Sequence, residues 1–124
     1  LTCGVAKAGD MDITMPIAEV VPKNEFFDFE AKYDPTKSDE IIPARISPEL
    51  TNRIKILSSM IYDILRCEGI IRVDYIVRED EIFMLEVNTT PGMTSNSFVP
   101  KMVRAMGGTL REVLTKIIDN KLNR

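Results

Sequence analysis

The hydrophobic and polar positions in the first part of the chain predict two strands, over residues 2–8 and 13–21. Ile17, Val20 and Val21 indicate that the second strand is partly buried. Gly9 and Asp10 lie between the two strands and predict a turn. A further short strand is predicted over residues 41–44.

The pattern changes to a helical period after Ser47. The run Ser47-Pro48-Glu49 supplies an N-cap, a first-turn proline and a first-turn acid. Gly69 predicts that this helix ends near residue 68. The residues that recur at helical spacing, and should form its buried face, are Leu50, Ile54, Leu57, Ile61 and Ile64.

Two further strands and two further helices complete the pattern. Residues 70–77 and 82–88 predict a hairpin, and residues 97–106 predict a helix that ends at a pair of glycines. Thr109 and Glu112 form a capping box for a last helix. Its predicted buried face is Leu110, Val113, Leu114, Ile117 and Ile118. We therefore expect an α+β fold with a mainly antiparallel sheet and about three packed helices.

Composition excludes several classes of function. The chain has 124 residues, of which 44% are hydrophobic and 28% charged, as expected for one globular domain. A net charge of −3 without a basic run gives no indication of binding to nucleic acid or to a membrane surface, and no apolar run is long enough to cross a bilayer. The lack of histidine excludes His-based acid–base chemistry and His-ligated metals.

The cysteines and the first residue bear on the origin of the chain. Cys3 and Cys67 have no metal-ligand spacing, so we expect free thiols in a cytoplasmic protein, with Cys67 as a small buried side chain. The chain starts at Leu1 inside a strand-like run, without an initiator Met. We therefore expect it to begin within a longer protein.

The predicted hairpin carries the candidate chemistry. Successive strand side chains point to opposite faces, so its polar residues gather on one face. A turn of residues 79–81 would give three opposed pairs: Arg72 with Asn88, Asp74 with Glu86, and Ile76 with Met84. The Cβ atoms of opposed residues lie roughly 4.5–5.5 Å apart. Two carboxylates this close repel each other unless a positive charge lies between them.

A magnesium site is the sharper of two interpretations of this face. Asp74, Glu86 and Asn88 offer hard oxygen ligands, which Mg²⁺ uses beside substrate phosphates. Arg72 adds a fixed positive charge where negative charge would develop. The alternative is a solvated strand face with a surface ion pair, and the alternation of residues fits both interpretations.

Two loops hold further candidates. Residues 23–40 are polar but rich in aromatic anchors, which is typical of a lid, and Lys32 can meet a terminal phosphate when such a lid closes. Residues 89–96 are small and polar and allow close approach to a ligand. Ser97 follows them; at a helix N-terminus, free N–H groups and the helix dipole suit a carboxylate or phosphate. A solvated lysine and simple capping by Ser97 are the alternatives.

Together these motifs resemble the D-alanine–D-alanine ligases of the ATP-grasp superfamily. The resemblance runs over nearly the whole chain, with its segments in the family's order. The segments are Phe29-Glu30-Ala31-Lys32-Tyr33, residues 69–75, Leu85-Glu86-Val87-Asn88-Thr89, and Pro91-Gly92-Met93-Thr94 with Ser95, Ser97 and Pro100. The Glu-Val-Asn run indicates ATP-grasp enzymes in general, whereas Pro-Gly-Met-Thr-Ser together with Glu-Ala-Lys-Tyr is typical of this family.

The resemblance implies catalytic and metal-binding roles. Asp74, Glu86 and Asn88 correspond to the ligands of two Mg²⁺ (or Mn²⁺) ions, with Glu86 as the bridge. Arg72 corresponds to the arginine that steadies the acyl phosphate and the tetrahedral intermediate. Gly92 corresponds to a backbone contact in the oxyanion and substrate region.

Substrate contacts follow from the same resemblance. Ser97 corresponds to the serine that holds the carboxylate of the second D-alanine. Tyr33 corresponds to a tyrosine associated with D-alanine rather than D-lactate as second substrate. ATP would contact Lys32, Phe26, Ile76 and Met84, the last two as a floor for the adenine.

The implied activity is ligation of two D-alanines through an acyl phosphate, with ATP as co-substrate, for peptidoglycan synthesis and hence for the cell wall and cell shape. Residues 1–124 would be the C-terminal part of the enzyme, with a lid loop at 23–40, a metal hairpin at 70–88, and a substrate loop and helix at 89–106. The family's N-terminal and central domains would be absent, so we expect the isolated chain to be inactive.

The resemblance further implies that the parent protein is a homodimer. Two other functions fit the residues: another ATP-grasp ligase that joins a different carboxylate and amine, or a non-catalytic metal-binding module.

Overall fold

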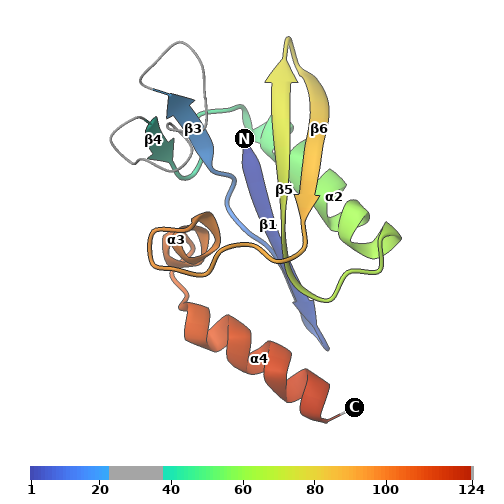
Figure 1. The fold of residues 1–124 in the computed structure, drawn as a ribbon. Coiled ribbons are helices and arrows are strands. Elements are labelled where there is room, and N and C mark those ends of the chain that lie inside the picture. Colours follow the sequence, from blue (N-terminus) through green and yellow to red (C-terminus); the bar gives the residue numbers. More distant parts are fainter. Residues whose placement is uncertain (23–37, 124) are drawn as a thin grey trace.

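Among the described residues, the main sheet has four strands and lies between helices on both faces (Figure 1). The computed structural model describes residues 1–22 and 38–123. The strands are β1 (Thr2–Ala8), β2 (Met11–Thr14), β5 (Gly69–Arg78) and β6 (Glu81–Asn88). They lie in the order β2-β1-β5-β6, and every neighbouring pair is antiparallel. A smaller sheet pairs β3 (Glu19–Pro22) with β4 (Ser38–Ile41).

Three helices among the described residues cover the sheet. Helix α2 (Pro48–Ile64) packs on one face, whereas α3 (Phe98–Ala105) and α4 (Leu110–Leu122) pack on the other (Figure 1). Each face therefore has its own apolar core. The predicted α+β class, with a mainly antiparallel sheet and three packed helices, is confirmed. No helix in this described part is long and apolar enough to cross a membrane.

Alternation along β5 assigns its side chains to the two faces. Ile71, Val73 and Tyr75 are buried against α2, each no more than 1% exposed. Ile70 belongs to the core on the α3 side. Since strand side chains alternate between the two faces, Arg72 and Asp74 lie on the α3 side too.

The close approach of α3 to the sheet depends on Gly4. A Cβ atom at this position would lie 2.6 Å from Met15 Sδ and 3.3 Å from Met102 Sδ. Met15 and Met102 are both fully buried. The missing side chain thus leaves room for two methionines between β1 and α3.

Helix α2 begins as predicted but ends earlier. Ser47 caps it, and its side chain accepts a hydrogen bond of 3.1 Å from Leu50 N. The expectation that the helix continues to about residue 68 is wrong, because Arg66 adopts a left-handed φ of 54° and interrupts the helical hydrogen bonds. Gly69, with φ 73°, instead starts β5.

The buried face of α2 is rotated from the predicted one. It consists of Leu50, Ile54, Ser58 and Tyr62, whereas the predicted Ile64 is 72% exposed. Ser58 can be buried because its hydroxyl donates to Ile54 O at 2.7 Å and lies 2.7 Å from the Tyr75 hydroxyl. A polar pair thus occupies part of the core between α2 and the sheet.

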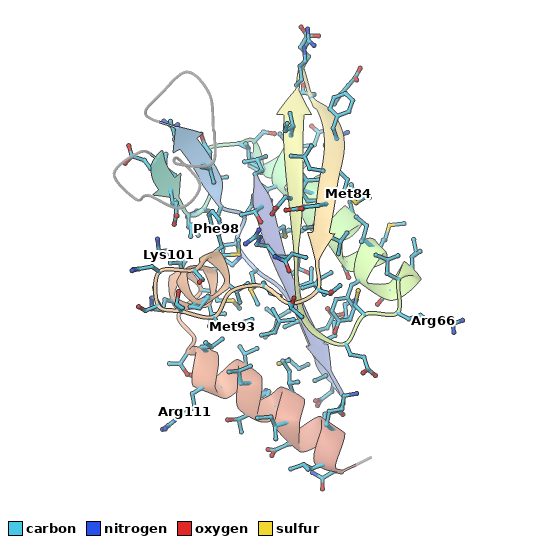
Figure 2. All side chains as sticks on the ribbon, viewed as in Figure 1. Arg66, Met84, Met93, Phe98, Lys101 and Arg111 are labelled. Atoms are coloured by element: carbon cyan, nitrogen blue, oxygen red, sulfur yellow. The ribbon has the colours of Figure 1, made fainter. Side chains whose placement is uncertain are left out.

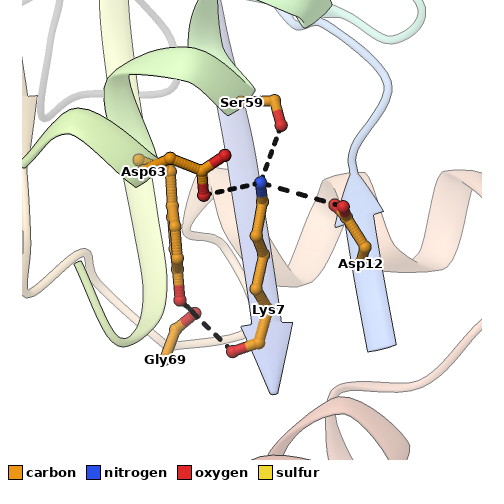
Figure 3. A network of polar contacts seen from close by, with 6 residues as sticks. Lys7, Asp12, Ser59, Asp63 and Gly69 are labelled. Carbon is orange, nitrogen blue, oxygen red and sulfur yellow. Dashed lines mark hydrogen bonds and ion pairs between the residues drawn. The ribbon is translucent and has the colours of Figure 1, made fainter. Parts of the chain in front are cut away.

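A polar network attaches the C-terminal end of α2 to β1 (Figure 3). Lys7 Nζ donates to Ser59 Oγ at 2.8 Å and to Asp63 Oδ1 at 3.0 Å. The Tyr62 hydroxyl lies 2.9 Å from Gly69 O and 3.2 Å from Lys7 O. A cavity of about 380 Å³ opens beside this network. At the C-terminal end of β1, the network thus provides hydrogen-bond partners for the Lys7 side chain and the Lys7 carbonyl.

Two strand predictions need correction. The strand expected over residues 13–21 is two strands in different sheets, because Pro16 has no N–H to donate and the chain turns between β2 and β3. The strand expected over 41–44 is β4, which ends at Ile41. Of the predicted lid loop, residues 38–40 are part of β4.

The C-terminal helices agree well with the pattern. Gly107, with φ 84°, follows α3, and the Thr109 hydroxyl accepts from Glu112 N at 3.2 Å. The buried face of α4 is narrower than predicted, since Val113 is buried but Ile118 is 55% exposed.

Both cysteines are free thiols. Cys3 is fully buried in the core beneath α2. Cys67 is half-buried rather than buried, because the helix has already ended before it.

Candidate functional site

The β5–β6 hairpin brings the predicted chemical residues opposite one another. Asp74 pairs with Glu86 and Arg72 pairs with Asn88, so both predicted pairs are confirmed. All four lie on the sheet face that carries α3, because Arg72 is on that face and its partners share it. The hairpin therefore offers two carboxylates, one amide and one guanidinium to a single region.

The turn of the hairpin is shorter than predicted. It has two residues, Glu79 and Asp80, with φ values of 51° and 65°. Two left-handed residues in succession match the twist of the strands that they join. Arg78 therefore pairs with Glu81, so the predicted turn of residues 79–81 is one residue too long.

A β-bulge between Asp74 and Tyr75 restores the predicted register at the site. Tyr75 pairs with Met84 while Asp74 pairs with Glu86, so the intervening Leu85 is the extra residue on β6. The shorter turn and the bulge offset each other at the carboxylates.

The same bulge changes the expected adenine floor. Ile76 pairs with Phe83 rather than Met84. The exposed side chain opposite Ile76 is therefore that of Phe83, at 48% exposure. The predicted pairing of Ile76 with Met84 is wrong because Met84 belongs with Tyr75.

Arg72 and Thr2 both donate hydrogen bonds to Asp74. Arg72 donates from Nε to Oδ1 at 3.0 Å and from Nη2 to Oδ2 at 3.1 Å, which is a bidentate pair. The Thr2 hydroxyl donates to Oδ1 at 2.6 Å. The side chains of Arg72 and Asp74 are 11% and 18% exposed, so this pair is largely withdrawn from water.

The surroundings of Asp74 keep it ionised. Burial raises the pKa of its carboxyl group, because removal of water disfavours the charged form. Hydrogen bonds from Arg72 and Thr2, with the positive charge of Arg72, act in the opposite direction and leave the pKa below its ordinary value. At neutral pH the group is therefore a carboxylate, the form that binds a cation.

Helix α3 reaches the hairpin through Phe98. Figure 2 shows Phe98 on the side of α3 that is directed toward the sheet. The guanidinium carbon of Arg72 lies 5.2 Å from the centre of the Phe98 ring, within the range of a cation–π interaction. This contact sets the N-terminus of α3 beside the guanidinium.

The donor set fits a hard divalent cation. Asp74 and Glu86 supply carboxylate oxygens and Asn88 an amide oxygen, which accepts from Thr90 N at 3.0 Å and is thereby oriented. Among the described residues, neither this site nor any other region brings together three Asp, Glu or Cys side chains that could hold a metal by themselves. Three side chains fill only part of an octahedral Mg²⁺ shell, so the set fits a cation that also takes oxygens from substrate phosphates and water.

Ser97 lies at the N-cap position of α3 without capping it. Its side chain makes no capping hydrogen bond in the described structure, and its hydroxyl lies 2.7 Å from that of Thr94. A Cβ atom at Gly92 would lie 2.8 Å from Ser97 Oγ. Simple capping is therefore the wrong interpretation. The first turn of α3 receives no side-chain cap from Ser97, and Gly92 passes directly over its hydroxyl.

Three predicted substrate-binding residues lie outside the described residues. They are Phe26, Lys32 and Tyr33. Their assignment rests on the sequence alone.

Two residues of this region were missing from the sequence prediction. Thr2 was assigned only to a strand, and Phe98 only to a helix. Pairing of β1 with β5 makes Thr2 the partner of Asp74, although they are 72 positions apart. No local pattern signals such a contact, whereas the alternation along β1 would place Thr2 on the site face once that pairing were known.

Comparison with known proteins shows the family of the chain. A family model described as D-ala D-ala ligase C-terminus matches residues 1–119. The D-alanine–D-alanine ligase of Bacteroides thetaiotaomicron is 60% identical over 122 residues, which cover 98% of this chain and 37% of that protein. The chain thus spans much less than half the length of this curated relative.

Solved structures agree with this match. The D-alanine–D-alanine ligase of Bacillus anthracis complexed with ATP is 34% identical, with a TM-score of 0.77 over 98% of this chain and 39% of that chain. The D-Ala:D-Ser ligase VanG of Enterococcus faecalis is 36% identical, with a TM-score of 0.74 over 95% of this chain and 34% of that chain. With its family match over nearly the whole length, the chain belongs to the D-alanine–D-alanine ligase C-terminus family.

Proposed function

We propose that this chain is the C-terminal part of an ATP-dependent ligase that joins two D-alanines, and that its β5–β6 hairpin binds two Mg²⁺ (or Mn²⁺) ions together with the phosphates of ATP. The observation that carries the proposal is the pairing of Asp74 with Glu86 on the face that also receives the N-terminus of α3. The curated relatives named D-alanine–D-alanine ligase support the same activity. Bound Mg²⁺ would neutralise phosphate charge during phosphoryl transfer.

Arg72 would stabilise charge on the transferred phosphoryl group and on the tetrahedral intermediate. The pair with Asp74 uses two of the five N–H groups of its guanidinium. The remaining groups can donate to phosphate oxygens. The Phe98 ring beside the guanidinium limits its movement, which favours a preorganised donor.

The second D-alanine would bind at the start of α3. Its carboxylate suits the Ser97 hydroxyl and the first-turn N–H groups, to which the Ser97 side chain gives no cap. Gly92 allows the backbone to approach the substrate closely because its missing side chain leaves the Ser97 hydroxyl accessible. The amine of this D-alanine would then attack the carbonyl carbon of the first D-alanine's acyl phosphate, forming the amide bond and releasing inorganic phosphate.

The nucleotide would lie against the exposed apolar part of the hairpin. Ile76 is 52% exposed, and its cross-strand neighbour Phe83 is the exposed apolar side chain beside it. Met84, the other predicted residue of the adenine floor, pairs with Tyr75 and so lies on the α2 face instead. We extend the proposal to Phe26 and Lys32 as contacts to ATP, and to Tyr33 as a contact to the second substrate, on the strength of the family resemblance.

Product analysis on the full-length parent protein tests the proposal. ATP, Mg²⁺ and D-alanine should yield ADP and D-alanyl-D-alanine in equal amounts, as measured by coupled ADP release and by mass spectrometry. No dipeptide, or ADP release that is independent of D-alanine, would contradict the assigned activity. The same protein would supply this dipeptide for peptidoglycan synthesis in the cytoplasm.

D-Serine is the second candidate for the attacking amine. The likeness to VanG, whose name gives D-Ala:D-Ser ligation, supports this alternative. A competition assay with equal D-alanine and D-serine, read by product mass, separates the two. We expect D-alanyl-D-alanine to dominate, whereas dominant D-alanyl-D-serine would transfer the assignment to the second candidate.

A further inference from the structure

The two carboxylate oxygens of Asp74 differ in the hydrogen bonds that they accept from Thr2 and Arg72. Oδ1 accepts two hydrogen bonds, from Thr2 Oγ1 at 2.6 Å and from Arg72 Nε at 3.0 Å. Oδ2 accepts from Arg72 Nη2 at 3.1 Å, and Asp74 also has a side-chain hydrogen bond with Glu86. A carboxylate oxygen has about two lone-pair sites. Both sites of Oδ1 are therefore occupied by donors from two different strands, β1 and β5.

We propose that Thr2 is a positioning residue for the metal site, because its hydroxyl donates to Oδ1 of Asp74 and so fixes the orientation of that carboxylate opposite Glu86. The inference rests on the proposed function of the hairpin. It assigns to β1 a part in a site that the sequence pattern located only in β5 and β6.

The backbone around Thr2 is suited to this task. Thr2 is 3% exposed and is the direct Cα partner of Asp74. On its other side, Thr2 N donates to Ala18 O and Ala18 N donates to Thr2 O, each at 2.9 Å. The hydroxyl is thus carried by a strand segment that is paired on both edges, and it has little freedom to turn away.

Arg72 alone would hold Asp74 less reliably. Its guanidinium is also the group proposed to meet phosphate oxygens, so a bound phosphate competes with Asp74 for its donors. The Thr2 hydroxyl is not part of that competition. Thr2 would therefore keep the metal ligand in place while Arg72 engages the reacting phosphoryl group.

The test uses Thr2→Val and Thr2→Ser in the full-length parent protein. Val keeps the shape of Thr and removes the hydroxyl, whereas Ser keeps the hydroxyl and removes the methyl group. Binding of Mn²⁺ in the presence of ADP is measured by electron paramagnetic resonance. The Mg²⁺ dependence of turnover is measured separately from KM for D-alanine.

We expect Thr2→Val to weaken Mn²⁺ binding by about 10–100-fold, as for loss of other groups that orient metal ligands, with KM for D-alanine unchanged. Thr2→Ser should restore binding to near the wild-type value. Wild-type Mn²⁺ affinity in Thr2→Val, or equal weakening in both variants, would overturn the inference. If Val prevents folding, Thr2→Ala compared with Thr2→Ser isolates the hydroxyl in the same way.

Asp74→Asn separates failure of this inference from failure of the proposed function. If Asp74→Asn greatly weakens Mn²⁺ binding but Thr2→Val does not, the hairpin binds the metal and only the role of Thr2 is wrong. If Asp74→Asn binds Mn²⁺ as tightly as the wild type, the hairpin is not the metal site and both proposals fail.

Discussion

Arg72 and Asp74 carry opposite charges, and both side chains are largely shielded from solvent. Their two-point contact and low exposure make the pair more than a surface ion pair, and removal of one partner would leave the other charge uncompensated. The polar alternation of the hairpin predicted that these residues share a face. It could not predict Thr2 or Phe98, because each approaches from another element.

Substitution of Arg72 by lysine should reduce the kcat of the activity proposed for the full-length parent protein by about 10²–10³-fold, since lysine retains charge but loses the rigid fork that donates at fixed positions. Steady-state kinetics with saturating ATP and D-alanine measure the effect. Arg78→Lys, at the exposed end of the same strand, is the matched control and should leave kcat within about twofold. A fully active Arg72→Lys enzyme would contradict the role given to Arg72.

The two thiols should differ in reactivity. Burial raises the pKa of Cys3 to about 11, so at pH 8 only about one molecule in a thousand carries the reactive thiolate. Cys67 is half-buried, and burial raises its pKa as well. Alkylation followed by peptide mapping should label Cys67 in the native protein and Cys3 only after unfolding. Rapid native labelling of Cys3 would show that β1 is not buried as described.

Individual elements were predictable where local chemistry determines them. The caps at Ser47 and Thr109 set the starts of α2 and α4. The buried face of α2 was less predictable, because a pattern based on hydrophobicity favours Ile64 over Ser58. The hydroxyl partner of Ser58 comes from β5, and no pattern within the helix records it.

Loss of the Ser58 hydroxyl and loss of the Tyr75 hydroxyl should lower the stability of the protein by different amounts. Ser58→Ala should destabilise the protein by roughly 1–3 kcal/mol, because it leaves the buried Tyr75 hydroxyl without its partner. Tyr75→Phe should cost only about 0.5–1.5 kcal/mol, since Ser58 keeps its bond to Ile54 O.

Urea unfolding of both single variants and of the double variant measures these costs. The double variant should be less destabilised than the sum of the single variants, because it leaves no orphaned hydroxyl. Additive effects, or a larger cost for Tyr75→Phe, would count against the described pairing.

At the scale of the whole molecule, the site forms where three distant segments meet on one face of the sheet. Residues of β1, the β5–β6 hairpin and the N-terminus of α3 converge there. The sequence predicted the class of the fold, and it predicted the hairpin pairing at Arg72 and Asp74 but not nearer the turn. It did not predict the layering, because long-range strand pairing and the Leu85 bulge have no local signal.

The isolated chain should lack ligase activity although it carries the hairpin. It spans 37% of the length of its curated relatives, and its three side-chain ligands need phosphate oxygens to complete a metal shell. Calorimetry should therefore detect Mg²⁺ binding only with nucleotide present, and coupled ADP release should show no turnover. Tight metal binding without nucleotide would instead favour a non-catalytic metal-binding module, and turnover comparable to the intact ligase would refute the expected inactivity.

The most direct measurement of the central claim is dipeptide synthesis by Asp74→Asn and Asp80→Asn variants of the full-length protein. Both changes remove one carboxylate from the same hairpin, but Asp80 lies in the exposed turn. The account predicts that Asp74→Asn lowers the rate of D-alanyl-D-alanine formation by at least about 100-fold, whereas Asp80→Asn remains close to wild type. Equal rates for the two variants would contradict a metal and phosphate site on the β5–β6 hairpin.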